Sequence, residues 1–232
     1  MMSEGAVGLI VGAGSGLSAS VARKFAAAGM RIALAARTVD DLEQLAREVG
    51  GKAFPCDASK REDVVNLFEA VTRQLGEPTV VVYNASYRVR GPLTEVDPSE
   101  VEKSIAVSAF GGFLVAQEAT RRMLVHGRGA ILLTGASASI KGYPQSASFA
   151  MGKFALRGLA QSMARELAPR GIHVAHFVID GGIRSAGRAE APGRPDSLLD
   201  PDAIADTYLH VLQQPRSAWT WEVELRPWVE TF

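Results

Sequence analysis

The chain has 232 residues, 47% of them hydrophobic and 22% charged, which suits one globular domain with a sizeable core. Lys plus Arg and Asp plus Glu are equal at 25 each, so no summed field favours nucleic acid or an anionic membrane. Cys56 is the one cysteine, which excludes an internal disulfide and is typical of a reducing compartment. The apolar run at 6–11 is too short for a signal peptide or a membrane span. We therefore expect a cytoplasmic protein with no nucleic-acid or membrane partner.

Strands alternate with helices through the first half of the chain. An apolar run enters a glycine cluster, and the Ala-rich stretch after it is typical of a helix that Gly29 ends. Apolar residues then recur at helical spacing, and the continuous run 80–82 indicates a strand buried on both faces of a parallel sheet. The expected elements are strands at 7–11, 32–35, 52–54 and 80–82, and helices at 17–28, 39–49 and 64–75.

The same alternation continues in the second half. A long helical pattern is interrupted at Gly111-Gly112, and a stretch at 184–199 rich in Gly, Pro and charge predicts a mobile substrate flap. The expected elements are helices at 99–125, 149–168 and 201–212, and strands at 130–133, 172–179 and 221–225. Without a repeat or a linker, this order predicts a single α/β domain over 1–232, a Rossmann-type doubly wound parallel sheet of about seven strands with helices on both faces.

The first turn between strand and helix has the composition of a nucleotide-binding loop. Glycines there let the backbone turn sharply and let a pyrophosphate approach the N-terminus of the helix. The pattern Gly-x-Gly-x-x-Gly fails at Leu17, whereas Gly-x-x-x-Gly-x-Gly matches at Gly12 and Gly16 and departs at Ser18. A tight turn that binds nothing is the alternative. The turn residues expected to contact a dinucleotide are Gly12, Gly14, Ser15, Gly16 and Leu17.

The end of the second expected strand bears on the choice of cofactor. An NAD site places an acidic residue on the ribose hydroxyls, but here the chain reads Ala36-Arg37-Thr38. Arg37 can bind a 2′-phosphate through two charge-assisted hydrogen bonds, so the sequence favours NADP(H) over NAD(H). A solvated surface arginine is the alternative.

Taken in order, the turn at 12–17, Asp57-Ala58, Asn84-Ala85 and Lys153 resemble the short-chain dehydrogenase/reductase family over nearly the whole chain. In that family the Asp contacts the adenine and the Asn-Ala segment lies beside the adenine ribose. The resemblance therefore implies cofactor contacts for Asp57, Ala58, Asn84 and Ala85.

The segment after the sixth strand also resembles the family. Its Pro-Gly corresponds here to Asp180-Gly181, and the resemblance implies that Gly181 and the backbone near Ile183 meet the nicotinamide amide. Asp180 is either a functional group at the edge of the sheet or a turn former before glycines.

The catalytic positions depart from the family. Its members use a tyrosine four residues before a lysine as the acid/base, and a serine about thirteen residues before that tyrosine to polarise the carbonyl. Here Lys153 is retained, Phe149 stands in the tyrosine's place, and the serine position is Ala136 with Ser137 beside it. The family's asparagine in the long middle helix aligns with Ser108.

A phenyl ring has no proton to give, and a positioned general acid is typically worth about 10² to 10⁴ in rate. The proton could come from water, from Ser137 or from Tyr143 in the loop after the fifth strand, for which a packing role is the alternative. We expect Lys153 to hydrogen-bond the nicotinamide ribose. The histidines are scattered without metal-ligand or triad spacing, so no metal is expected.

Three functions stay open on the sequence. One is an NADP(H)-dependent oxidoreductase with an atypical catalytic tetrad that acts on a small apolar carbonyl or alcohol of unknown identity. The second is a non-catalytic NAD(P)-binding protein that senses redox state or scaffolds a partner. The third is a purely structural subunit that pairs through the long helices at 99–125 and 149–168, as members of the family do in dimers and tetramers. Such pairing is compatible with all three functions, so we expect a homodimer or homotetramer.

Overall fold

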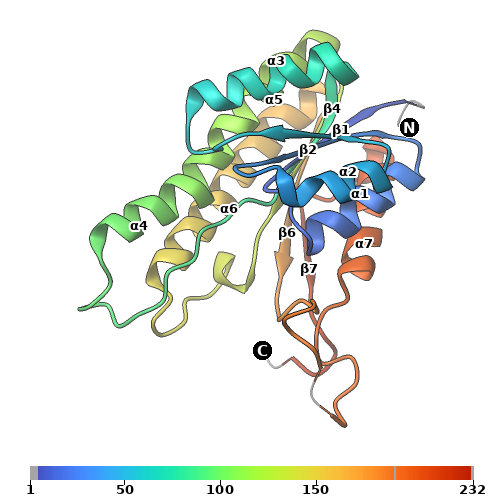
Figure 1. The fold of residues 1–232 in the computed structure, drawn as a ribbon. Helices are drawn as coiled ribbons and strands as arrows, with labels where there is room; N and C mark the ends of the chain where they lie inside the picture. The colour runs from blue at the N-terminus through green and yellow to red at the C-terminus, as the bar shows by residue number, and fades with distance from the viewer. Residues whose placement is uncertain (1–4, 191, 231–232) are drawn as a thin grey trace.

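A seven-stranded parallel sheet forms the centre of the computed structural model, which describes residues 5–190 and 192–230 (Figure 1). The strand order is β3-β2-β1-β4-β5-β6-β7, so the direction of winding reverses between β1 and β4. The carboxyl ends of strands at such a reversal form the crevice where α/β proteins bind ligands. The strands are β1 (Val7–Val11), β2 (Arg31–Ala36), β3 (Lys52–Pro55), β4 (Pro78–Tyr83), β5 (Gly129–Thr134), β6 (Ile172–Ile179) and β7 (Glu222–Leu225).

Helices cover both faces of the sheet, as the unbroken apolar strands require (Figure 1). Two core clusters result, one on each face, with Phe68 and Leu156 in the first and Phe25 and Tyr208 in the second. On the first face lie α3 (Arg61–Leu75), α4 (Pro98–Ile105), α5 (Gly111–His126) and α6 (Ala147–Leu167); on the second lie α1 (Leu17–Ala27), α2 (Glu43–Glu48) and α7 (Pro201–Gln213). The predicted single-domain, Rossmann-type parallel sheet is confirmed.

Two expected helices differ in detail. The one at 39–49 is a 3-10 turn, Asp40–Leu42, followed by the short α2. The one at 99–125 is α4, a π-helical turn at Ala106–Phe110, and α5, so the interruption precedes Gly111-Gly112. These glycines serve close packing inside α5: a Cβ at Gly111 would lie 2.5 Å from the Tyr83 hydroxyl oxygen, and one at Gly112 2.6 Å from Leu156.

The segment predicted to be a flap extends beyond the carboxyl ends of β6 and β7 (Figure 1). It is tied at both ends, because Ile183 and Leu199 form an isolated parallel bridge. Its mobility stays a prediction. None of the helices in the described ranges combines the length and apolarity that a membrane span needs.

Candidate functional site

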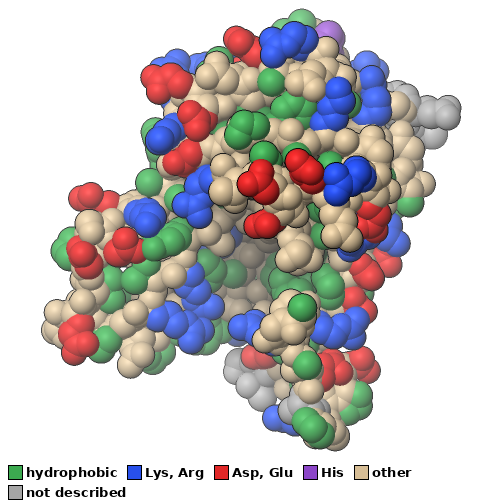
Figure 2. Space-filling view, in the orientation of Figure 1, with side chains coloured by type: hydrophobic (Ala, Val, Ile, Leu, Met, Phe, Trp, Pro, Cys, Tyr) green, Lys and Arg blue, Asp and Glu red, His purple; other side chains and the backbone are tan. Residues whose placement is uncertain are grey.

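Two neighbouring cavities lie at the carboxyl ends of the strands and share Asn84 and Ser86. We call the first, of about 300 Å³, the Arg37 cavity; the second, of about 420 Å³, is the Lys153 cavity. Figure 2 shows the molecule hollowed in this region. The Arg37 cavity contains Gly12, Arg37, Asp57, Ala58 and Ala85, whereas the Lys153 cavity contains Gly16, Leu17, Ser137, Tyr143, Phe149, Lys153, Gly181 and Ile183.

The glycine turn brings β1 against the loop after β4. Gly12 has φ +83, and a Cβ there would lie 2.3 Å from the backbone nitrogen of Ala85, so only glycine fits. Ser18, at the departure from the glycine pattern, donates to the Gly12 carbonyl at 2.9 Å and accepts from Asn84 Nδ2 at 2.7 Å. This serine therefore joins the turn to the asparagine.

The remaining turn residues divide between different surfaces. Gly16 and Leu17 line the Lys153 cavity, whereas Gly14 and Ser15 line a separate hollow of about 160 Å³ that faces Arg23 and Glu48. The structure thus does not bring Gly14 and Ser15 into either main cavity.

Asp57 is held as an ionised acceptor in the Arg37 cavity. Its Oδ1 accepts the Ser59 hydroxyl at 2.6 Å and the Ser59 backbone N–H at 3.1 Å. These hydrogen bonds lower the pKa of Asp57, and the positive charges of Lys60 and Arg37 act in the same direction. The neighbouring Cys56 is buried, which raises the pKa of its thiol to about 12 and leaves it an unreactive core residue.

Lys153 is the buried cation of the second cavity. Its Nζ donates to the Thr134 carbonyl at 2.7 Å, and burial lowers its pKa to about 8. Phe149 lies one turn earlier on α6, with its ring centroid 5.8 Å from Lys153 Nζ. Arg88 lies over the same ring, with its guanidinium carbon 4.8 Å from the ring centroid.

A histidine on β6 supports the floor of this cavity. His176 is fully buried and its Nδ1 lies 3.0 Å from Glu222 Oε2, while Arg157 binds the same carboxylate from α6 at 2.6 Å. Burial lowers the pKa of His176 to about 4, and the charges of Lys153 and Arg157 add to the effect, whereas Glu222 opposes it. A Cβ at Gly135 would lie 2.3 Å from its Nε2, so the ring packs directly under the loop after β5.

The residues predicted to replace the usual catalytic groups do not all meet. Ser137 and Tyr143 line the Lys153 cavity, but Ser108 does not belong to its lining. Ser108 is buried, and its hydroxyl accepts from the backbone N–H of Tyr87 at 3.2 Å and reaches the Tyr87 carbonyl at 3.4 Å. It therefore holds the loop after β4. Ser139 likewise holds a loop, since its Oγ accepts from the Ala136 N–H at 3.1 Å.

Asp180 is more than a turn former. It is buried and forms ion pairs with Lys141 at 3.0 Å and Arg226 at 3.2 Å. Burial alone would raise the pKa of Asp180, but hydrogen bonds from Ser137 and Lys141 and the nearby positive charges hold it below its usual value. Asp180 thus anchors the loop after β5. An acidic residue directly after an apolar strand was a visible signal; its partners, distant in sequence, were not.

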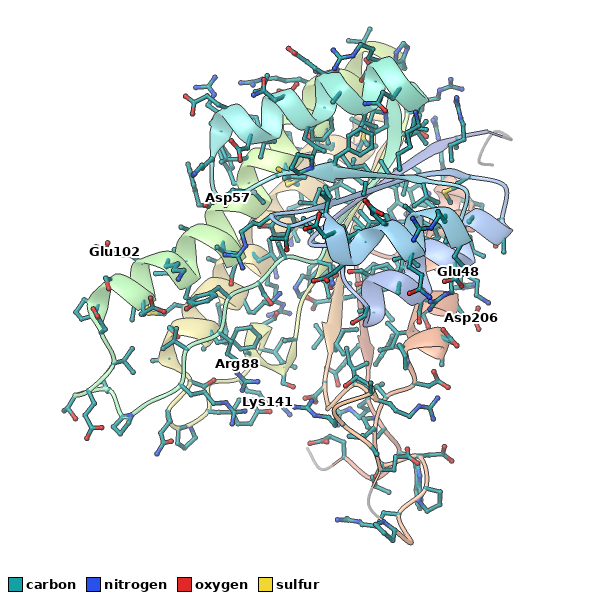
Figure 3. All side chains as sticks on the ribbon, in the orientation of Figure 1. Glu48, Asp57, Arg88, Glu102, Lys141 and Asp206 are labelled. Carbon is teal, nitrogen blue, oxygen red and sulfur yellow. The ribbon has the colours of Figure 1, made fainter. Side chains whose placement is uncertain are left out.

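Sequence reasoning also missed two arginines that line the Lys153 cavity, Arg88 and Arg188. Figure 3 shows Arg88 and Lys141 in the same part of the molecule, beyond the carboxyl ends of the strands. Isolated arginines in loops carry no pattern, so only the fold reveals that they meet.

A crevice of this kind at the reversal point of a doubly wound parallel sheet defines a Rossmann-type nucleotide-binding protein. The chain belongs to the short-chain dehydrogenase/reductase family of oxidoreductases, since residues 6–192 match the model of the short chain dehydrogenase family.

Individual relatives agree with this assignment. A short chain aldehyde dehydrogenase 1 from Euphorbia lathyris is 32% identical over 215 residues, which is 88% of this chain and 72% of the relative. Among solved structures, a short-chain dehydrogenase from Rhodopseudomonas palustris is 36% identical, with a TM-score of 0.83 over 96% of this chain and 99% of the other. An alcohol dehydrogenase from the archaeon Thermococcus sibiricus, complexed with 5-hydroxy-NADP, is 28% identical, with a TM-score of 0.86 over 98% and 99%.

Proposed function

We propose that the protein is an NADP(H)-dependent oxidoreductase of the short-chain type whose proton donor is not the usual tyrosine. The observation that carries the proposal is the pair of adjoining cavities, with Arg37 in one and Lys153 in the other. The 2′-phosphate and adenosine would lie with Arg37 and Asp57, and the nicotinamide half beside Lys153, Gly181 and Ile183.

The N-terminus of α1 fits the pyrophosphate of such a cofactor. No side chain caps this helix and its first turn holds no acidic residue. A Cβ at Gly16 would meet nothing within 4 Å, so open space adjoins the first N–H groups of the helix. A helix end of this kind attracts an anion through its N–H groups and its dipole. The archaeal relative complexed with 5-hydroxy-NADP supports the choice of cofactor.

A bound nicotinamide would supply the hydride, so that a carbonyl, NADPH and a proton would give an alcohol and NADP⁺. Lys153 uses one donor on the Thr134 carbonyl, which fixes the ammonium and leaves its other donors for a ribose hydroxyl. Phe149 cannot donate a proton. Its ring instead gives the cavity an apolar side chain in its lining.

Tyr143 is the proposed proton donor. It lines the Lys153 cavity. The pKa of the neighbouring Lys141 is raised, chiefly by its hydrogen bond to Asp180, and Tyr143 adds to this rise. Lys141, two residues earlier on the same loop, is held by an ion pair with buried Asp180, and its positive charge lies near Tyr143. Tyr143 is also the one phenol among the described residues that line the Lys153 cavity, so its hydroxyl can take the role of the family's tyrosine as proton donor.

NADPH oxidation measured against a panel of small ketones and aldehydes tests this assignment. Tyr143→Phe should lose about 10² to 10⁴ in rate while its NADPH dissociation constant stays within about threefold of wild type. Phe149→Tyr should raise the rate, because it places a hydroxyl near Lys153. A Tyr143→Phe protein as active as wild type would remove Tyr143 from the mechanism.

A non-catalytic redox sensor or scaffold is the second candidate function. Two observations favour it: the Phe149 ring is covered by Arg88, and the Ser108 hydroxyl is engaged by Tyr87. This function predicts that wild type and Phe149→Tyr both bind NADPH and that neither oxidises it with any carbonyl in the panel.

We also propose a homodimer or homotetramer in the cytoplasm. Four large apolar side chains are exposed on α5, α6 and the π turn, and a second copy of the chain would cover them. These side chains are Phe110, Phe113, Met151 and Phe154.

A further inference from the structure

The Lys153 cavity is cationic and has no counter-charge in its wall. Arg88, Arg188 and Lys153 line it, and its lining includes no Asp or Glu. In the described ranges neither Arg88 nor Arg188 forms an ion pair or donates a side-chain hydrogen bond. Partial desolvation lowers the pKa of Arg88, and the positive charges of Arg90 and Arg188 act in the same direction. Lys and Arg side chains gather below the hollow in Figure 2.

Arg88 is held in place from both sides along the chain. Ser104 Oγ donates to the Tyr87 carbonyl at 2.8 Å, and Ser148 Oγ donates to the Val89 carbonyl at 3.0 Å. Its backbone is therefore fixed against α4 and α6. The side chain itself is exposed, and its one ordering contact among the described residues is with the Phe149 ring, whose centroid lies 4.8 Å from the guanidinium carbon.

Arg188 lines the cavity from the segment after β6. Ser185 and Arg188 exchange two backbone hydrogen bonds of 3.0 Å, which close a tight turn after β6. The guanidinium lies against Gly182, since a Cβ there would be 3.2 Å from Nη1. Arg88 follows β4 and Arg188 follows β6, so two loops far apart in the sequence each contribute one cation to the lining of this cavity.

Beside these cations, the lining of the same cavity includes three large apolar side chains, Phe149, Ile179 and Ile183. We propose that the substrate is a carbonyl compound with a small apolar body and a carboxylate, which Arg88 and Arg188 bind while the body packs on these three side chains. The inference rests on the proposed function and replaces a neutral substrate by an acidic one. The alternative partner for the two arginines is a phosphate of the cofactor. The affinity of the arginine variants for the nucleotide distinguishes this alternative from a substrate carboxylate.

Calorimetry with matched acids and ketones tests the inference without turnover. Pyruvate and phenylpyruvate are compared with acetone and phenylacetone, which lack the carboxylate, on protein with and without NADP⁺. Wild type should bind at least one acid about tenfold or more tightly than its ketone. Arg88→Met and Arg188→Met should each weaken that acid about 10- to 100-fold and leave the ketone and NADP⁺ within about threefold.

Arg90→Met is the matched control, because it removes the same charge from the same cluster but does not line the cavity. It should keep the preference for the acid. Equal affinity of wild type for every acid and its ketone overturns the inference. So does a loss of NADP⁺ affinity in Arg88→Met or Arg188→Met with acid binding unchanged, since the arginines would then hold the cofactor. Failure of wild type to bind NADP⁺ would instead contradict the proposed function. The affinity for the acids is also measured on protein without nucleotide, so it tests the inference independently of NADP⁺ binding.

Discussion

Protonation of His176 should destabilise the fold as the pH falls. The folded protein holds the pKa of His176 at about 4, whereas an unfolded histidine titrates near 6.5. The unfolded chain therefore binds a proton at a pH where the folded chain does not, and folding stability is lost as the pH falls below about 6.5. The full difference corresponds to about 3 kcal/mol, of which about 2 kcal/mol is lost between pH 7.5 and pH 5.0.

Urea unfolding followed by tryptophan fluorescence measures this loss. The free energy of unfolding is determined at pH 7.5 and 5.0 for wild type, His176→Asn and His210→Asn, in which the substituted histidine is exposed. Wild type and His210→Asn should lose about 2 kcal/mol more than His176→Asn over this interval. Glu222 keeps its ion pair with Arg157 in all three proteins, so the difference isolates the imidazole. An equal loss in all three proteins would refute the reasoning.

Three further predictions follow from particular residues. Gly12→Ala should destabilise the fold by about 2 kcal/mol or more, because Gly12 has a positive φ and a Cβ there would clash with the Ala85 backbone. Gly14→Ala is the control, since a Cβ at Gly14 meets open space. Equal melting temperatures of the two variants would contradict this prediction. Relative to Lys153→Met, wild type should gain about 2 kcal/mol of stability between pH 7.5 and 9.5, since the pKa of Lys153 is about 8 in the folded state and near 10.5 in the unfolded state. The free energy of unfolding in urea is measured against pH for both proteins. Parallel profiles would argue against a buried charge at Lys153. Phe154→Glu, on an exposed apolar position of α6, should shift the assembly towards monomer in light scattering after size exclusion, and an unchanged mass would remove this surface from the interface.

The order of elements could be predicted because buried parallel strands leave continuous apolar runs and their helices leave a 3.6-residue period. The length of the long middle helix could be predicted, but the π turn before Gly111 could not. It depends on how the turn packs, with the Tyr83 hydroxyl donating to the Val107 carbonyl.

In the candidate site, too, some residues could be predicted from the sequence and others could not. The glycine turn and Lys153 lie at fixed spacing in contiguous segments, so a pattern can find them. The pairing of Asp180 with Lys141 joins residues 39 positions apart, and Arg88 and Arg188 line one cavity although they come from distant loops. Contacts of this kind are made by the tertiary fold and leave no period or motif in the sequence.

Titration of the purified protein with NADPH and NADH, by nicotinamide fluorescence at fixed salt, tests the central claim most directly. Wild type should bind NADPH at least about tenfold more tightly than NADH, through the 2′-phosphate on Arg37, and Arg37→Met should remove that preference while keeping affinity for NADH. Equal binding of the two cofactors by wild type would contradict the role of Arg37, and binding of neither at near-millimolar concentration would contradict the account as a whole.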